Sequence, residues 1–208
     1  SEVAITYRCN LRCAFCYAGC NCTSNPTGST AEMTTEQIKT VLWKIFHQAK
    51  VPSVSFTGGE PTLIPELPEL ISYVKNLGMR VNLITNGTRI TKGLAQKLAD
   101  SGLDSAQVSL EGVTAATHDA VVRSPGAYTK TVAAVKHLKA TGIHTHTNTT
   151  ITRANLHETK DFPAFVKQEF GSDKFSMNLI IPTGSGAVDP QLLVRYHEIG
   201  HYLEDILA

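Results

Sequence analysis

The chain has 208 residues, of which 42% are hydrophobic, so it can bury one substantial core and is most simply a single domain. Its 19 basic and 18 acidic residues leave a formal net charge of +1, which predicts neither a nucleic-acid partner nor binding to an anionic membrane. Its apolar runs are strand-length, far below the roughly 20 residues that a transmembrane helix needs, and its first residues do not form a signal peptide.

Short β-type runs alternate with helical ones along the chain, a pattern typical of a parallel sheet with crossover helices. Ile38 and Leu42 recur at helical spacing. Thr34 and Gln37, just before them, predict a capping box, and Gly142 predicts the end of a later helix. Six β/α units in this order predict an α/β fold, a (β/α)6 partial TIM barrel with outer helices and all strand carboxyl ends on one face, where function is expected. The predicted strands are residues 3–7, 53–56, 80–85, 105–110, 144–152 and 175–181.

All five cysteines lie between Cys9 and Cys22. An odd number in one short segment indicates a metal site in a reducing compartment rather than a disulfide framework, so we expect a cytoplasmic protein. Cys9, Cys13 and Cys16 form a C-x3-C-x2-C run, one thiolate short of the four that a conventional iron–sulfur cluster takes. One iron of a [4Fe–4S] cluster would then have no protein ligand. Two alternatives stay open: a structural zinc loop, and an electron-transfer cluster with Cys20 as its fourth ligand.

The sequence Cys-Ala-Phe-Cys-Tyr that ends this run, together with Cys9 upstream, resembles the cluster-binding loop of the radical S-adenosylmethionine (radical SAM) superfamily. The resemblance implies that Cys9, Cys13 and Cys16 ligate a [4Fe–4S] cluster at the catalytic centre, with Phe15 and Tyr17 beside the cofactor. The open iron would chelate S-adenosylmethionine. One electron would then cleave it to a 5′-deoxyadenosyl radical that takes hydrogen from a substrate. The resemblance also implies an electron donor such as a flavodoxin or a ferredoxin.

Two further motifs follow predicted strands and resemble cofactor-binding positions of the superfamily. Gly58, Gly59 and Glu60 match its GGE motif, which holds the methionine amino group. Glycines let the backbone approach a ligand closely, and Glu60 can accept a hydrogen bond from an ammonium group. Ser109 and Glu111 stand where relatives often read Ser-x-Asp-Gly near the ribose or the methionine carboxylate, although here Glu replaces Asp. Taken alone, each motif is also compatible with ordinary turn chemistry.

Other polar residues are candidates for the same face. Arg123 resembles an arginine that pairs with the cofactor carboxylate, a task that suits its planar fork. Asn86 closes the third strand, and Asn148 and Thr150 lie near the end of the fifth, so these three are possible contacts to cofactor or substrate. The fifth strand is unusually polar for a buried parallel strand, and this polar face either lines the barrel or meets the outer helices. Alternation puts on one of its faces His144, His146, Asn148 and Thr150.

A second metal motif lies near the end of the chain. His197, Glu198 and His201 match the HExxH pattern of zinc metallopeptidases, in a helix predicted for residues 191–207. This helix is expected to pack outside the barrel, far from the strand carboxyl ends, and no third ligand is signalled. Peptidase is therefore the less favoured function. An apolar stripe that explains the helix without a metal comprises Leu192, Tyr196, Leu203 and Leu207.

We expect residues 1–208 to be one radical SAM core domain excised from a longer protein, because both ends lie close to predicted structure. The likeness is densest to the SPASM/twitch subgroup of sulfatase-maturating, peptide-modifying and haem-pathway enzymes. Many of these carry a cysteine-rich C-terminal extension with auxiliary clusters, which this sequence lacks. The substrate is expected to be a peptide, a tetrapyrrole or a small metabolite. The polar stretch 19–31 is either a loop that faces this substrate or a mobile surface.

Overall fold

A computed structural model describes residues 1–20, 32–187 and 189–207 of the chain. Cys22 and most of the polar stretch 19–31 lie outside the described residues, so the expectations for them remain predictions. No helix in the described part is both long and apolar enough to cross a membrane.

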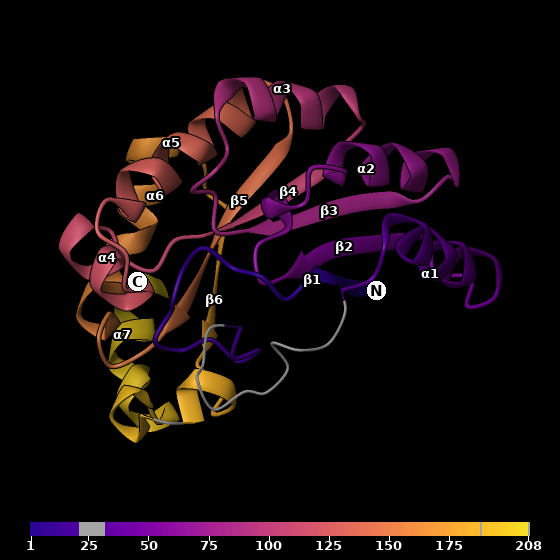
Figure 1. Ribbon diagram of the computed structural model, residues 1–208. Helices are drawn as coiled ribbons and strands as arrows, with labels where there is room; N and C mark the ends of the chain where they lie inside the picture. Colours follow the sequence, from indigo (N-terminus) through magenta and orange to yellow (C-terminus); the bar gives the residue numbers. More distant parts are fainter. Residues whose placement is uncertain (21–31, 188, 208) are drawn as a thin grey trace.

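The six predicted strands form one parallel sheet in chain order, which confirms the α/β prediction. In the described chain the sheet is open, because its outermost strands do not pair with each other, and helices line its outer side (Figure 1). This is the predicted (β/α)6 partial barrel, with the carboxyl ends of all strands at one edge. The strands are β1 (Glu2–Thr6), β2 (Ser53–Gly58), β3 (Arg80–Thr85), β4 (Ser105–Ser109), β5 (His144–Ile151) and β6 (Phe175–Leu179).

The crossover helices begin and end at local sequence signals. At the start of α1 the predicted capping box is present: the Gln37 N–H donates to Thr34 Oγ1 (3.2 Å) and the Thr34 N–H to Gln37 Oε1 (2.8 Å). Gly142, with φ of 85°, follows the end of α5, as predicted. The α-helices are α1 (Thr35–His47), α2 (Leu67–Asn76), α3 (Lys92–Asp100), α4 (Ala115–Val122), α5 (Ala127–Ala140), α6 (Phe162–Phe170) and α7 (Tyr196–Leu207). Short 3-10 turns are η2 (Pro61–Leu63), η3 (Leu156–Asp161), η4 (Gly184–Ala187) and η5 (Pro190–Leu192).

The two faces of the sheet differ in chemistry. The outer face packs on the helices through apolar residues such as Phe56 and Leu83, both fully buried. The inner face is polar: Asn82 Nδ2 donates to Ser55 Oγ (3.3 Å), and Ser105 Oγ donates to Asn82 Oδ1 (2.8 Å). Register partners in a parallel pair face the same side, so the polar residues of β5 lie on this inner face with those of β4. The polar face of β5 therefore lines the barrel.

The last helix corrects a prediction. It begins at Tyr196, after a separate turn at η5, rather than continuing from residue 191. Val194 and Ile199 pack against Ile151 at the carboxyl end of β5, whereas Tyr196, expected in the apolar stripe, is 83% exposed. Val194 and Ile199 make this apolar contact at the end of β5. The helix α7 therefore lies against the carboxyl ends of the strands and not far from them.

Candidate functional site

The loop of residues 7–20, here called the cysteine loop, leaves β1 at the carboxyl edge of the sheet. Its cysteines are reduced thiols rather than halves of disulfides. Cys9 and Cys13 pack on a small apolar cluster that contains Leu11 and Val122. The shape of the loop is fixed mainly by four other segments of the same edge.

The first segment is the exit from β2, the glycine motif. The Gly59 N–H donates to the Thr6 carbonyl and the Glu60 N–H to the Arg8 carbonyl, each at 2.8 Å. A Cβ atom on Gly58 would lie 2.1 Å from the Thr6 carbonyl oxygen, and one on Gly59 would lie 2.1 Å from that of Arg8. The two glycines therefore let the β2 exit pack on the backbone that leads into the cysteine loop, a close approach to protein that sequence analysis did not predict.

The second and third segments are the exit from β3 and the end of α4. Asn86 Nδ2 donates to Asn10 Oδ1 (3.1 Å), and Asn10 Nδ2 donates to Thr88 Oγ1 (2.8 Å). The Ala14 N–H donates to the Val121 carbonyl at 3.0 Å. The helix α4, which sequence analysis did not predict, thus presents its carboxyl end to the middle of the loop.

The fourth segment follows β6 and comes from the other end of the chain. The Ser185 N–H donates to the Cys16 carbonyl (2.8 Å), and Thr183 Oγ1 donates to the Tyr17 carbonyl (3.4 Å). Between them lies Gly184, with φ of 54°. A Cβ atom there would lie 2.4 Å from both the Cys16 and the Tyr17 carbonyl oxygens, so only glycine fits. We call residues 183–185 the β6 clamp.

The three cysteines differ in acidity. Burial raises the pKa of Cys9, and burial together with the nearby Glu111 carboxylate raises the pKa of Cys13 well above its usual value. A hydrogen bond from the Cys20 thiol lowers the pKa of Cys16 to about 6, while the same contact raises that of Cys20. The hydrogen bond therefore favours the thiolate form of Cys16, and metal binding must displace protons from the other two cysteines.

The donor set fits an iron–sulfur cluster. In the described ranges, no three His, Cys, Asp or Glu side chains are arranged to hold one metal ion. A [4Fe–4S] cluster with one open iron takes three cysteine ligands from the protein. The cysteine loop offers three reduced thiols, Cys9, Cys13 and Cys16, on one braced backbone. Cys20 lies next to Cys16 as its hydrogen-bond donor.

Glu60 has its carboxylate occupied by the protein. It is fully buried, and Oε1 accepts hydrogen bonds from the Thr62 N–H (3.0 Å), Thr62 Oγ1 (2.5 Å) and Thr85 Oγ1 (2.7 Å). Oε2 accepts one from the Asn86 N–H (2.8 Å). Burial raises the pKa of Glu60, and these donors oppose the rise. The carboxylate thus joins the exits of β2 and β3, which support the loop.

Glu111 is also buried, but it has a single hydrogen-bond donor among the described residues, the Thr150 N–H at 2.7 Å from Oε2. Burial raises the pKa of Glu111 to about 8. Its backbone is fixed from two sides: its N–H donates to His118 Nδ1 (3.0 Å), and Asn155 Nδ2 donates to its carbonyl (2.9 Å). Its side chain points toward β5, and its charge influences Cys13.

Three predicted cofactor contacts keep polar groups available. Ser109 lies at the end of β4, and its hydroxyl has no partner within the described ranges. Asn148 Oδ1 accepts hydrogen bonds from Ser176 Oγ (2.7 Å) and Asn178 Nδ2 (2.8 Å), and no residue in the described part of the chain accepts from its own Nδ2. Arg123 caps α4 in the left-handed region, with an exposed side chain that pairs with no described residue. These groups can bind an incoming ligand.

The other predicted residues differ in their exposure and position. Phe15 is half-buried and Tyr17 is 54% exposed on either side of Cys16. On the inner face, His146 Nε2 lies 3.4 Å from Gln107 Oε1, and His144 is exposed at the amino end of β5. The histidines are thus remote from the carboxyl edge.

The HExxH motif has its central carboxylate engaged elsewhere. Glu198 Oε1 pairs with Arg153 (2.7 Å), and Oε2 accepts the Arg195 N–H (2.8 Å). The His201 side chain is 89% exposed and lies 3.9 Å from Glu204. Glu198 therefore ties the start of α7 to the exit of β5.

Sequence analysis missed several residues that shape the site. Glu158 is buried, accepting hydrogen bonds from Thr114 Oγ1 and Thr117 Oγ1 (both 2.6 Å), and so fixes the start of α4. Asn155 and Gly184 act in the same supporting way. Their partners are distant in sequence, so the available signals were weak: a polar residue just after a strand, and a glycine in a loop at the carboxyl edge.

An open (β/α)6 sheet with a three-cysteine loop across its carboxyl edge defines a class of iron–sulfur enzyme. The sequence profile of the Radical SAM superfamily matches residues 3–166, and the chain belongs to this superfamily. Its members use a [4Fe–4S] cluster and S-adenosylmethionine.

Curated relatives support this assignment, and solved structures share the fold. The chain is 32% identical over 97% of its length to an AdoMet-dependent heme synthase of Nitratidesulfovibrio vulgaris, and 32% identical over 88% to the mycofactocin maturase MftC of Mycobacterium ulcerans. It covers 54% and 47% of these two proteins, and so spans about half their length. The crystal structure of Streptococcus suis SuiB bound to S-adenosylmethionine shares the fold, with a TM-score of 0.77 and 17% identity, over 99% of this chain and 47% of that one.

Proposed function

We propose that this chain is the S-adenosylmethionine-cleaving core of an enzyme that abstracts a hydrogen atom from its substrate. The observation that carries the proposal is the cysteine loop, in which three thiols stand on a backbone held by the exits of β2, β3 and β6 and by the end of α4. When bound, a reduced [4Fe–4S] cluster supplies the electron that cleaves S-adenosylmethionine to an organic radical.

The chain's own residues divide into two roles. Cys9, Cys13 and Cys16 would hold the cluster. Ser109 and Asn148 offer unused hydrogen-bonding groups on the inner face, for the ribose or the methionine carboxylate. Two further residues can donate hydrogen bonds to S-adenosylmethionine. The guanidinium of Arg123 suits a carboxylate. The N–H of Thr150 is taken by Glu111, but its hydroxyl has no described partner.

Glu60 and Asn86 act differently in this proposal. Their side chains are already bonded within the protein, so they support the cysteine loop and leave the binding of the methionine amino group to neighbouring backbone. Gly58 and Gly59 contribute by the same close packing.

The substrate and partners follow from the relatives. Their names refer to haem synthesis and to peptide maturation, so a tetrapyrrole or a peptide is the proposed substrate class. A flavodoxin or a ferredoxin would supply the electron. Thiols kept reduced for a cluster favour the cytoplasm. Because the relatives are about twice as long, a further domain in the parent protein, such as one with auxiliary clusters, belongs to the proposal.

The test is anaerobic reconstitution with iron and sulfide, followed by reduction and addition of S-adenosylmethionine. We expect about four irons per chain, 5′-deoxyadenosine among the products, and an EPR signal that changes when S-adenosylmethionine binds. Cys13→Ala should lose all three. Cys20→Ala should retain them; if it loses the cluster as Cys13→Ala does, the chain holds a four-cysteine cluster and the proposal is wrong.

A further inference from the structure

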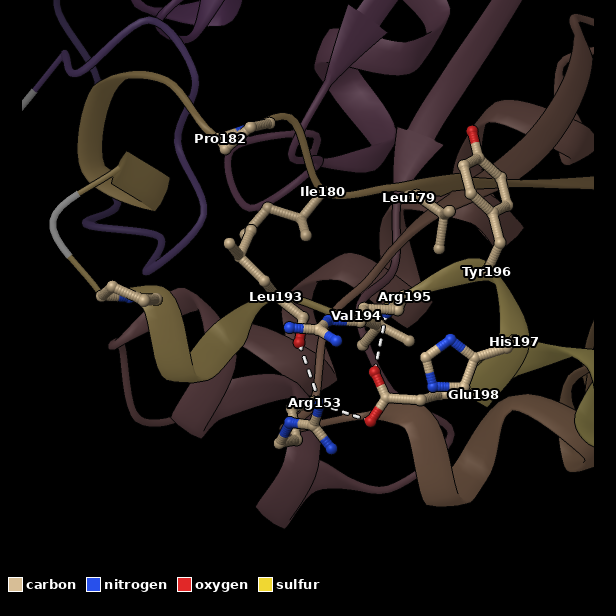
Figure 2. A pocket seen from close by; sticks show the side chains of 11 residues that line it. Arg153, Leu179, Ile180, Pro182, Leu193, Val194, Arg195, Tyr196, His197 and Glu198 are labelled. Atoms are coloured by element: carbon tan, nitrogen blue, oxygen red, sulfur yellow. Dashed lines mark hydrogen bonds and ion pairs between the residues drawn. The ribbon is translucent and has the colours of Figure 1, made fainter.

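A cavity of about 690 Å³ lies between the exit of β6 and the start of α7 (Figure 2). It also borders Arg153, just past the carboxyl end of β5. Its size suits a small organic ligand or one part of a larger one. None of the residues proposed to hold the cluster or S-adenosylmethionine lines this cavity.

The two walls of the cavity differ in chemistry. The apolar wall comprises Leu179, Ile180, Pro182, Leu193 and Val194. The other wall is polar and comprises Arg153, Arg195, His197 and Glu198. Glu198 neutralises Arg153 through their 2.7 Å ion pair. The Arg195 guanidinium is exposed and has no partner in the described chain, which leaves one positive charge uncompensated.

The start of α7 adds to this positive character. The Glu198 carboxylate accepts the Arg195 N–H, but Arg195 has no side-chain acceptor to cap the first turn in return. The N–H groups of Tyr196 and His197 therefore have no acceptor in the described ranges. Unpaired N–H groups and the helix dipole both favour an anion at this position.

The cavity is next to the proposed cluster site. The segment that forms its wall at Ile180 and Pro182 continues directly into the β6 clamp, which bonds to the carbonyls of Cys16 and Tyr17. A molecule held in the cavity is thus bound beside the loop that would carry the cluster.

We propose that this cavity binds a carboxylate group of the substrate, with the apolar part of the same substrate against the opposite wall. The claim that the bound molecule is the substrate rests on the proposed function, whereas the claim that the cavity binds a carboxylate does not. Arg195 would hold the carboxylate, since its planar fork matches a carboxylate and a single uncompensated guanidinium balances a single negative charge. The Arg153–Glu198 ion pair positions the start of α7, and the N–H groups of that helix would complete the anion site.

The test uses a fluorescent probe of this chemistry, 11-(dansylamino)undecanoic acid, and its methyl ester, titrated into the reconstituted protein. We expect the acid to bind about tenfold more tightly than the ester, since a charge-assisted hydrogen bond is worth that much. Arg195→Gln should abolish this preference and Arg195→Lys should keep part of it. The matched control is Arg80→Gln at the amino end of β3, which should keep all of it.

Equal affinity for acid and ester, no binding of either, or a preference that survives Arg195→Gln would each overturn the proposal. Circular dichroism of each variant separates misfolding from loss of the site, and the Arg195→Lys protein gives the answer if Arg195→Gln does not fold. The formation of 5′-deoxyadenosine by the unaltered protein is measured separately. Its absence would refute the proposed function, whereas a missing carboxylate preference would refute only the present inference.

Discussion

The β6 clamp gives the sharpest test of how the cysteine loop is held. In Gly184→Ala the new Cβ would lie 2.4 Å from two backbone oxygens of the loop, so the clamp or the loop must move. A non-glycine residue in the left-handed region costs about 1–2 kcal/mol. The displaced Ser185–Cys16 hydrogen bond costs about 1 kcal/mol more. We expect a total of about 2–3 kcal/mol, or roughly 5–10 °C in the unfolding midpoint for a domain of this size.

The matched control is Gly171→Ala, which separates backbone strain from the clash. Gly171 has φ of 58°, nearly that of Gly184, but a Cβ atom there meets no other atom within 4 Å. Thermal unfolding of both cluster-free variants, and iron and sulfide content after reconstitution, provide the comparison. Gly171→Ala should lose about 1–2 kcal/mol and keep its iron, while Gly184→Ala should lose more stability and most of its iron. Equal unfolding midpoints and equal iron in the two variants would refute the clamp.

Three further predictions concern single side chains. Thr147 Oγ1 is buried and has no hydrogen-bond partner among the described residues, so Thr147→Val should stabilise the chain by about 1 kcal/mol in chemical unfolding. Thr149→Val, which removes a 2.7 Å bond to the Leu110 carbonyl, should destabilise it by a similar amount; the same sign for both would contradict this reasoning. Glu111 has its pKa raised to about 8, so the folded chain binds more protons than the unfolded one and cluster-free stability should fall between pH 5 and 8. Glu111→Gln should flatten that slope, and an unchanged slope would show that Glu111 does not cause it. In the cluster-free protein, Cys20→Ala should raise the pKa of Cys16 from about 6, seen as a later rise of thiolate absorbance at 240 nm; an unmoved titration would exclude the hydrogen bond.

Local patterns predicted the fold well. All six strands form where β-type runs occur, and Thr34 and Gln37 make their capping box because both partners lie within one turn. The cysteine spacing likewise predicted one loop that carries three thiols, because Cys9, Cys13 and Cys16 are close to one another in the sequence. These features depend on neighbours in the sequence, which pattern analysis can read.

Features that depend on distant partners could not be predicted in this way. That Glu60 accepts a hydrogen bond from an ammonium group remains a prediction, whereas its bonds to Thr85 and Asn86, at the exit of the next strand, could not be read from the local pattern. The position of α7 depends on Val194 and Ile199 meeting the end of β5, and neither residue stood out in the expected stripe. The clamp joins residues 166 positions apart, a contact that no local pattern contains.

That last separation has a consequence for biosynthesis. The three cysteines leave the ribosome well before Ser185, but the backbone that shapes their loop is complete only after Ser185 has been made. A nascent chain shorter than this has the thiols without their final brace. Delivery of iron and sulfide is therefore most productive after the last strand has been translated, and the early thiols need protection from oxidation until then.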